Sequence, residues 1–457
     1  MSVENKILNL KANVAVIGLG YVGLPLALNL AEAGYTVTGI DLSVSKVNLL
    51  NRGESYISDI SNEALRKVNH TGRFMASSEF SLIQYADVII ACVPTPLNDY
   101  TDPDLSSIYA VVDYLQTYMK KGSLVILEST TYPGCTEEII QARLEATGLQ
   151  VGKDFYLCFS PERIDPSNRD FTLNNTPKIV GGVTLKCSNM ASELYKKICK
   201  DVITVSSPKV AEFTKLLENT FRSVNIAFIN EIAMMSEKMG IDVWEVIQAA
   251  STKPFGFMPF YPGPGIGGHC IPLDPMYLSW KAKYYKFFSR FIELSNSINS
   301  GMPDYVVSKL HQLLNQKSLH INKSKILVLG VAYKPEVNDD RESPALELIK
   351  LLIDEGAHVD FYDPYVEYIE LENGRTLFSV DYDVNAFKQY ECCILMTAHK
   401  AFRYEELKNL HVPIFDTRNA FSSFDDSHIY KLGAGLLHAA KDQEQEEMLQ
   451  KITVAQG

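Results

Sequence analysis

Hydrophobic positions near the start of the chain follow two periods. Residues 13–18, NVAVIG, form a short apolar run that ends in glycine. Residues 24–34, LPLALNLAEAG, repeat apolar positions at helical spacing up to Gly34, and residues 35–41, YTVTGID, return to a strand-like run. A strand, a helix and a strand in this order predict one βαβ unit of a parallel sheet.

Two more apolar runs predict further strands of the same sheet. They are ADVIIACVP at 86–94 and SLVILEST at 123–130, and both end in residues that favour turns. In a parallel doubly wound sheet the ligand site lies at the carboxyl ends of the strands. The pattern therefore predicts a nucleotide-binding Rossmann domain over residues 1–200.

A different pattern occupies the middle of the chain. From Ser207 to Gly240 apolar residues recur at helical intervals, and after the opening Pro208 no proline or glycine interrupts them. This pattern predicts one long helix. We interpret it as the core of a central helical domain over residues 201–305, acting as a spacer between domains and as a dimer surface.

The first pattern returns after residue 324. KILVLGVAYKP at 325–335, SPALELIKLLIDEG at 343–356 and AHVDFYDP at 357–364 repeat the order of strand, helix and strand. We expect a second Rossmann-like domain over residues 306–457. The predicted fold class is α/β: two doubly wound Rossmann-like domains joined by a central helical domain with one long helix.

Composition narrows the function classes. The 457 residues are 46% hydrophobic and 21% charged, with a formal net charge of −12. This balance is typical of globular domains and argues against a nucleic-acid partner, because no basic stripe is present. An anionic small molecule stays compatible with it, since a helix N-terminus and a few cations can hold a phosphate.

The eight cysteines show neither a CxxC metal pattern nor a disulfide framework, so we expect reduced thiols and no metal site. We also find no signal peptide and no apolar run that could span a bilayer. These features predict a cytoplasmic protein without membrane insertion.

A glycine motif predicts the cofactor. Gly18, Gly20 and Gly23 form G-x-G-x-x-G between the first strand and the first helix, and Asp41 ends the next strand. The glycines permit a tight turn and close approach of a pyrophosphate, and the acidic residue binds the ribose hydroxyls and disfavours a 2′-phosphate. The motif predicts NAD. Lys46 either flanks the ribose or is a solvated surface charge.

The second chemical signal is a loop rich in glycine and proline. In YPGPGIGGHCIPLDP, residues 261–275, Cys270 stands beside His269 and four residues before Asp274. A backbone with few side chains lets a substrate reach the thiol, whereas we expect Cys92, Cys158, Cys392 and Cys393 to be structural. The loop favours Cys270 as a nucleophile, although His269 and Asp274 are also common turn residues.

Seven ordered motifs between residues 13 and 420 resemble the UDP-glucose/GDP-mannose dehydrogenase family. They are VIGLGYVGLPLA, VPTPL, ESTTYPG, SPERIDP, KLLENTFRSVNIAFINE, GPGIGGHCIPLDP and YKPEVNDDRES. The resemblance implies a three-domain subunit, a homodimer or higher homo-oligomer formed through the central helix, and two hydride transfers to NAD without release of the aldehyde. The thiolate would add to the aldehyde, and the resulting thioester would be hydrolysed by water.

The resemblance also implies roles by position. Cys270 matches the nucleophile, Lys215 and Asn219 the pair that steadies the oxyanion, and Asp274 the residue that handles protons near the water. Thr130 and Glu162 match further catalytic positions. The matching cofactor positions are Gly18, Gly20, Tyr21, Val22, Gly23, Asp41, Lys46, Pro94, Thr95, Thr130 and Arg341. The matching substrate positions are Glu162, Arg163, Lys215, Asn219, Tyr261, Gly267 and Lys334.

The sugar is harder to assign. Glucose-specific relatives carry a second glutamate where this chain has Pro166, and SPERIDP and KPFGFMPFYPGPGIGGHC resemble the UDP-N-acetylglucosamine 6-dehydrogenase branch, which serves surface polysaccharide synthesis. We therefore expect UDP-N-acetylglucosamine. UDP-N-acetylgalactosamine, UDP-N-acetylmannosamine and UDP-glucose stay open, as do two other classes: a two-electron hydroxyacid dehydrogenase and a non-catalytic nucleotide-sugar binding protein.

Overall fold

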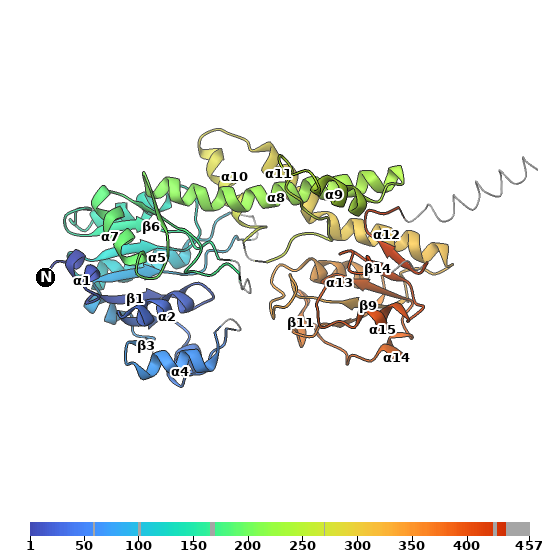
Figure 1. The fold of residues 1–457 in the computed structure, drawn as a ribbon, viewed down its shortest axis with the longest axis horizontal. Helices are drawn as coiled ribbons and strands as arrows, with labels where there is room; N and C mark the ends of the chain where they lie inside the picture. The colour runs from blue at the N-terminus through green and yellow to red at the C-terminus, as the bar shows by residue number, and fades with distance from the viewer. Residues whose placement is uncertain (58–59, 99–101, 165–169, 269, 424–426, 436–457) are drawn as a thin grey trace, which may run out of the picture. The chain divides into compact units, whose positions relative to one another are not determined.

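The structure is a computed structural model of the chain (Figure 1). It describes residues 1–57, 60–98, 102–164, 170–268, 270–423 and 427–435. The chain divides into two compact units. The first unit comprises residues 1–220 with 273–288, and the second unit comprises residues 221–272 with 289–457.

A sheet forms the centre of the first unit. Within the described residues its strands lie in the order β3-β2-β1-β4-β5-β6-β7-β8, and all neighbours are parallel except β6 and β7. The strands are β1 (Asn13–Ile17), β2 (Thr36–Ile40), β3 (Phe74–Ser77), β4 (Val88–Ala91), β5 (Leu124–Leu127), β6 (Tyr156–Phe159), β7 (Lys178–Gly182) and β8 (Val202–Val205). The order reverses between β1 and β4, which is where doubly wound sheets bind their ligands.

Helices cover both faces of this sheet. Val14 and Val16 belong to one core with side chains of α2, α4 and α7, whereas Ala15 and Ile17 belong to another with side chains of α5 and α6. The alternation follows from the two-residue period of a strand. The helices of the first unit are α1 (Val3–Leu8), α2 (Gly23–Ala33), α3 (Val44–Asn51), α4 (Asn62–His70), η1 (Phe80–Tyr85), α5 (Ser106–Tyr118), η2 (Thr136–Gln141), α6 (Ala142–Glu145), α7 (Leu185–Tyr195) and α10 (Asp274–Tyr284).

One helix, α8 (Pro208–Met239), corresponds to the long helix predicted at 207–240 (Figure 1). Its 32 residues span about 48 Å at 1.5 Å per residue. Pro208 opens the helix, where the missing N–H costs nothing. Gly240 follows its end with a φ of +73°, a left-handed conformation that glycine adopts easily.

The second unit holds a smaller parallel sheet. Within the described residues its order is β10-β9-β13-β14-β15, and a separate hairpin joins β11 and β12. The strands are β9 (Lys325–Leu329), β10 (His358–Tyr362), β11 (Tyr368–Glu370), β12 (Thr376–Phe378), β13 (Cys392–Leu395), β14 (Ile414–Asp416) and β15 (Ile429–Lys431). The helices are α9 (Val243–Ser251), α11 (Arg290–Ser300), α12 (Met302–Gln316), α13 (Pro344–Asp354), α14 (Val384–Phe387) and α15 (Tyr404–Lys408).

This second sheet is also covered on both faces. Ile326 and Val328 pack in a core with side chains of α12 and α13, and Leu327 and Leu329 in a core with side chains of α14 and α15. The predicted fold class is confirmed: two doubly wound α/β domains and a helical segment built on α8. The limits 1–200, 201–305 and 306–457 stay predictions. Residue 305 lies inside α12, whose Met302 belongs to the core of the second sheet.

The internal repeat extends to hydrogen bonds. Asp41, directly after β2, accepts from the backbone N–H groups of Leu19 at 2.9 Å and Ser43 at 2.9 Å. An acidic residue at the end of the second strand therefore shapes the turn after the first strand. The same arrangement recurs in the second unit.

There, Asp363 follows β10 and accepts four backbone N–H groups. Oδ2 accepts from Val331 at 2.7 Å and Ala332 at 2.9 Å, and Oδ1 accepts from Tyr365 at 2.8 Å and Val366 at 3.1 Å. The Asp363 side chain is buried. Its acceptor positions are filled by the protein, so it shapes the turn instead of binding a ribose.

His399 completes this buried cluster. The backbone N–H of Glu336 donates to Nδ1 of His399 at 3.1 Å, which leaves the ring proton on Nε2. Nε2 then donates to Oδ2 of Asp363 at 3.1 Å. The pair fixes the chain that follows β9, which carries the predicted substrate residue Lys334.

Replacing Asp363 with Asn should destabilise the second sheet by about 2–4 kcal/mol, because either carboxylate oxygen that becomes NH2 leaves two buried backbone N–H groups without an acceptor. Thermal unfolding combined with hydrogen exchange of residues 325–332 measures this. Asp360→Asn is the matched control, since Asp360 is exposed on the same strand and its amide can still accept from Tyr390. Equal stability of the two variants would show that the four bonds contribute little.

The Asp363 carboxylate also limits the stability of the second sheet at low pH. Burial opposes its ionisation, but His399 and the N–H groups of Ala332 and Tyr365 outweigh burial and hold the pKa of Asp363 below its usual range. A lowered folded pKa gives stability above the unfolded value of about 3.9 that is lost as the pH falls through the folded pKa. Acid titration of the wild type should therefore show a loss below about pH 4 that Asp363→Asn lacks.

Candidate active site

Glycines shape the turn between β1 and α2. A Cβ on Gly18 would lie 2.4 Å from the carbonyl oxygen of Cys92, and one on Gly23 would lie 1.9 Å from that of Gly18. Both positions need glycine because the backbone is too close. A Cβ on Gly20 would meet no protein atom within 4 Å. The open space beside Gly20 fits the approach of a pyrophosphate, as the motif predicts.

The start of α2 adds to this cradle. Val22 precedes the helix and makes no side-chain cap, so no capping side chain occupies the positive end of the helix dipole, although the Leu24 N–H already donates to the carbonyl oxygen of Gly20 at 3.1 Å. Tyr21 is exposed, and Asp41 is half-buried beside the turn. Lys46 lies on α3 with its Nζ 5.4 Å from the ring centre of Tyr56. These residues can hold a dinucleotide at the sheet edge.

The ends of β4 and β5 lie at the same edge. The hydroxyl of Thr95 donates to the carbonyl oxygen of Thr130 at 2.7 Å, and the hydroxyl of Tyr277 donates to that of Thr95 at 2.9 Å. Pro94 is exposed. The structure thus brings together Pro94, Thr95 and Thr130 and ties them to α10.

A turn after β6 carries the next two predicted residues. Oε1 of Glu162 accepts from the backbone N–H groups of Arg163 and Ile164, both at 2.7 Å. The Arg163 guanidinium pairs with Glu218 of α8 at 2.7 Å. Burial opposes ionisation of Glu162, but Lys178 and the two N–H groups outweigh it, so the pKa of Glu162 lies below its usual value. Pro166 lies outside the described residues.

Helices α8 and α10 supply a buried polar cluster. Lys215 and Asn219 are one turn apart on α8 and are 8% and 2% exposed. The side-chain amide of Asn219 donates to the carboxylate of Asp274, which is 3% exposed and opens α10. Within the described residues Lys215 has no carboxylate within 4 Å. A buried ammonium beside a buried amide can stabilise an oxyanion.

The second unit carries the cysteine loop. Cys270 is exposed, whereas Cys92 is half-buried and the other six cysteines are buried. The loop is Gly-rich for a packing reason that sequence analysis did not give. A Cβ on Gly268 would lie 2.6 Å from the Tyr333 ring, and one on Gly267 would lie 2.7 Å from the carbonyl oxygen of Glu342. The loop therefore lies flat against the segment after β9. His269 lies outside the described residues.

The other predicted residues of the second unit are dispersed around that loop. Tyr261 is exposed and stacks on Trp244 with ring centres 6.1 Å apart. Nζ of Lys334 lies 5.7 Å from the ring centre of Tyr333. The guanidinium of Arg341 forms two hydrogen bonds with Asp339, at 2.8 and 2.6 Å.

Several buried or half-buried polar groups were missed by sequence analysis. The Glu212 carboxylate on α8 accepts from both the backbone N–H, at 2.9 Å, and the hydroxyl, at 2.7 Å, of Thr136, and burial raises its pKa to about 7. Arg418 lies so close to Gly263 that a Cβ there would be 2.5 Å from its guanidinium. Lys178 and Glu128 form a buried ion pair. Only the tertiary structure identifies these, because charged residues are usually exposed.

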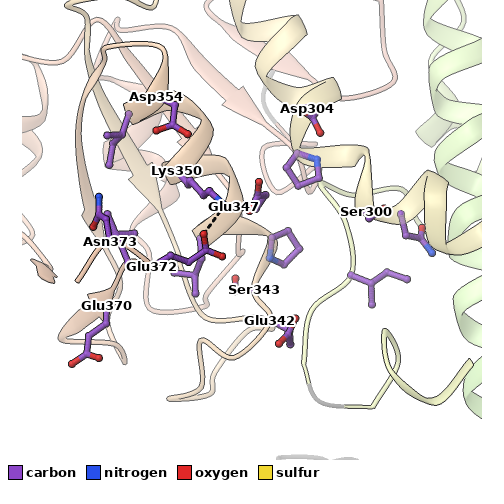
Figure 2. A pocket seen from close by; sticks show the side chains of 17 residues that line it. Ser300, Asp304, Glu342, Ser343, Glu347, Lys350, Asp354, Glu370, Glu372 and Asn373 are labelled. Atoms are coloured by element: carbon purple, nitrogen blue, oxygen red, sulfur yellow. Dashed lines mark hydrogen bonds and ion pairs between the residues drawn. The ribbon is translucent and has the colours of Figure 1, made fainter. Parts of the chain in front are cut away.

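A cavity of about 630 Å³ lies in the second unit, and Figure 2 shows the side chains that line it. Its walls come from α11, α12, α13, the residues just before α13, the β11–β12 hairpin and Ile266, and they carry many carboxylates: Asp304, Glu342, Glu347, Asp354, Glu370 and Glu372. Lys350 pairs with Glu372 at 2.7 Å. None of the predicted site residues lines this cavity. Its negative charge disfavours a nucleoside diphosphate.

The fold and the first-unit site define an NAD-linked oxidoreductase with two Rossmann-like domains. Three family models agree: the NAD binding domain of the UDP-glucose/GDP-mannose dehydrogenase family matches residues 12–199, its central domain residues 209–301 and its UDP binding domain residues 327–423. The chain belongs to the UDP-glucose/GDP-mannose dehydrogenase family. It is therefore a dehydrogenase that uses NAD and acts on a CH–OH group.

Relatives support this assignment over most of the chain. A UDP-N-acetyl-D-mannosamine dehydrogenase of Pyrococcus horikoshii is 37% identical, covering 77% of this chain and 84% of the relative. A UDP-N-acetyl-D-glucosamine 6-dehydrogenase of Pseudomonas aeruginosa is 34% identical, covering 87% and 93%. The solved UDP-D-ManNAc dehydrogenase of Pyrococcus horikoshii superposes with a TM-score of 0.84 at 33% identity, covering 93% and 99%.

One further property follows from the helices. In the described part of the chain, none of them combines the length and the apolar character that crossing a bilayer requires.

Replacing Gly20 with Ala should leave folding unchanged and weaken NAD binding by about ten-fold, because the added methyl enters the open space of the cradle without touching protein. Isothermal titration with NAD and thermal unfolding measure the two effects. Gly23→Ala is the matched control, since its Cβ would collide with backbone and should lower the melting temperature. Unchanged NAD affinity in Gly20→Ala would place the pyrophosphate elsewhere.

Proposed function

We propose that the protein catalyses the NAD-dependent, four-electron oxidation of the C6 alcohol of UDP-N-acetylglucosamine to the carboxylate, for surface polysaccharide synthesis. The observation that carries the proposal is the buried cluster of Lys215, Asn219 and Asp274. Cys270 lies four positions before Asp274, in the loop rich in glycine and proline at residues 261–275. A two-electron hydroxyacid dehydrogenase has no use for such a thiol.

Each residue has a defined task in this reaction. Two molecules of NAD, held in turn by the Gly18–Gly23 turn and Asp41, would each supply the hydride acceptor for one of the two oxidations. Lys215 and Asn219 stabilise the oxyanion that develops on C6, because their buried donors need no reorganisation. The Cys270 thiolate adds to the aldehyde to give a thiohemiacetal, and its oxidation leaves a thioester. Asp274 handles protons while water hydrolyses the thioester, which releases the thiol and the carboxylate.

The chain itself limits the distance between the thiol and the acid. Asp274 is four positions after Cys270, with three residues between them, so their Cα atoms are at most about 14 Å apart. Asp274 is fixed by its bond to Asn219 and by its place at the start of α10, where the helix dipole favours a negative charge. Exposure of Cys270 allows a substrate to reach it.

The proposed cofactor and nucleotide contacts follow the residues assigned by the family resemblance. NAD is held by the Gly18–Gly23 turn and by Asp41, whose carboxylate also shapes that turn. The residues proposed to contact the nucleotide sugar are Glu162, Tyr261, the Gly267 backbone and Lys334. Arg341 binds the cofactor in this proposal. Its guanidinium either breaks its hydrogen bonds with Asp339 or keeps them while it contacts the cofactor.

The sugar is proposed to carry a 2-acetamido group. The relatives from Pyrococcus and Pseudomonas are named for 2-acetamido sugars. UDP-N-acetylmannosamine is the second candidate, because the relative that is 37% identical carries that name. The two sugars differ in one stereocentre, so the same C6 chemistry applies to both.

We also propose a homodimer formed through α8. Residues spaced by three, four or seven along this helix stay exposed although they are apolar: Val210, Phe213, Leu217, Phe221, Phe228, Met235 and Met239. Such a stripe along a long helix is typical of a helix-to-helix interface. The expected place of action is the cytoplasm.

A panel of nucleotide sugars tests the substrate. UDP-N-acetylglucosamine should give two NADH per sugar and a kcat/KM at least ten-fold above that of UDP-glucose, because a buried site built for an amide loses about 1–3 kcal/mol when the amide is missing. A higher kcat/KM for UDP-N-acetylmannosamine would change only the epimer that we propose as the substrate, and the proposed reaction would stand. One NADH per sugar, or preference for UDP-glucose, would contradict the proposal.

Replacing Cys270 with Ser should reduce kcat by about 10³-fold while the melting temperature stays the same, because a hydroxyl is a much weaker nucleophile than a thiolate and the side chain is exposed. Iodoacetamide should label Cys270 before the other thiols. Cys393→Ser, in buried strand β13, is the control that changes a thiol away from the site and should keep kcat. Wild-type turnover by Cys270→Ser would exclude covalent catalysis.

A further inference from the structure

A buried ion pair near the ends of β5 and β7, beside Glu162, has no task in the reaction described above. Nζ of Lys178 lies 3.1 Å from Oε2 of Glu128 and 3.3 Å from Oε2 of Glu162. The Lys178 side chain is 3% exposed and that of Glu128 is fully buried. The hydroxyl of buried Tyr195 donates to the other oxygen of Glu128. One lysine therefore faces two carboxylates.

Stability alone does not explain this arrangement. Removing a lysine and a carboxylate from water costs several kcal/mol per ion, and apolar residues of equal volume usually stabilise a core as well or better. A second carboxylate beside the same lysine adds like-charge repulsion. The contact of Glu162 with the buried Lys178–Glu128 pair is therefore better explained by the function of Glu162 than by stability.

The geometry around Glu162 is consistent with such a purpose. One oxygen accepts the N–H groups of Arg163 and Ile164, and the other faces Lys178, so the carboxylate is held from two sides. The neighbouring Arg163 pairs with Glu218, which directly precedes Asn219 on α8. The turn is thereby fixed both to the sheet and to the helix that carries the oxyanion donors.

We propose that Lys178 is a positioning residue: from its buried pair with Glu128, it fixes the Glu162 carboxylate in the orientation that the substrate site requires. Lys178 touches neither substrate nor cofactor. The inference rests on the proposed role of Glu162 and adds the group through which the sheet sets its position.

Charges around Glu162 come from several elements. Lys178 on β7 and Lys215 on α8 lower its pKa, and Glu128 after β5 is the opposing charge. Burial raises the pKa of Glu128 despite the lysine beside it. The ammonium therefore stabilises the ionised form of Glu162, while Glu128 favours its protonated form. Burial and Glu128 also raise the pKa of the Cys92 thiol, so this neighbour stays neutral.

Three variants separate positioning from stability. Glu128→Gln mimics the protonated acid and leaves the contact between Lys178 and Glu162 intact. Lys178→Met with Glu128→Gln removes the buried pair together, so that the cation is lost without leaving Glu128 charged in the core. Lys178→Arg keeps the cation. All three are full-length proteins, with melting temperatures recorded first.

Activity should follow the contact with Glu162. Glu128→Gln should keep kcat within about three-fold and leave the acid limb of the pH profile in place or move it to lower pH, because loss of the opposing charge favours the ionised form of Glu162. The double variant should fold but lose at least about ten-fold in kcat, with the acid limb of the profile moved to higher pH. The sign follows because losing a nearby cation raises the pKa of a carboxyl group, so protonation begins at higher pH. Lys178→Arg should recover most of kcat.

A second readout does not depend on turnover. Hydrogen exchange of the Arg163 and Ile164 amides, which donate to Glu162, should accelerate at least ten-fold in the double variant and stay as in the wild type in Glu128→Gln. If no nucleotide sugar is oxidised by the wild type, the proposed function fails, and this comparison still tests Lys178. Wild-type kcat, pH profile and amide exchange in the double variant would overturn the inference.

Discussion

Buried or half-buried carboxylates that accept backbone N–H groups shape the loops on which the site depends. Asp41 holds the turn after β1, Asp363 holds the turn after β9, and Glu162 holds its own turn after β6. Glu212 of α8 holds the chain at Thr136 after β5. Parallel strands end with unsatisfied loop N–H groups at one edge of the sheet, and a carboxylate can accept two or more of them at once. Loop shape, and with it the site, follows from these bonds.

The acidic residue that follows the second strand of the βαβ unit serves a different purpose in each of the two sheets. Asp41 is half-buried beside a glycine whose Cβ would meet open space, so its surroundings leave room for a ligand. Asp363 is buried, and its oxygens are occupied by four N–H groups and His399. One βαβ design therefore supports a dinucleotide site in the first unit and a rigid scaffold in the second. The difference lies in burial and not in residue type.

Much of the fold could be predicted from the sequence because its signals are local. The run at 13–17, the glycine turn and the helix ending before Gly34 each depend on neighbours within a few positions. The long helix α8 was predicted for the same reason. Strands β3, β6, β7 and β8 were not predicted, because the conformation of these segments depends on pairing with strands that are distant in the sequence. The antiparallel contact of β6 and β7 is a property of that pairing.

The features of the site also fall into two groups: those that local sequence predicts and those that depend on tertiary packing. The sequence by itself determined the chemical inventory: a glycine turn with Asp41 for NAD, the pair Lys215 and Asn219 one helical turn apart, and Cys270 in a loop that cannot be a strand or helix. The tertiary structure alone decided that Asn219 bonds to Asp274, that Gly267 and Gly268 are needed for packing, and that Lys178 joins Glu128 and Glu162. Spacing along a chain records which side chains share a local element. Burial and long-range contacts arise only when distant segments pack. They decide which charged side chains pair with one another.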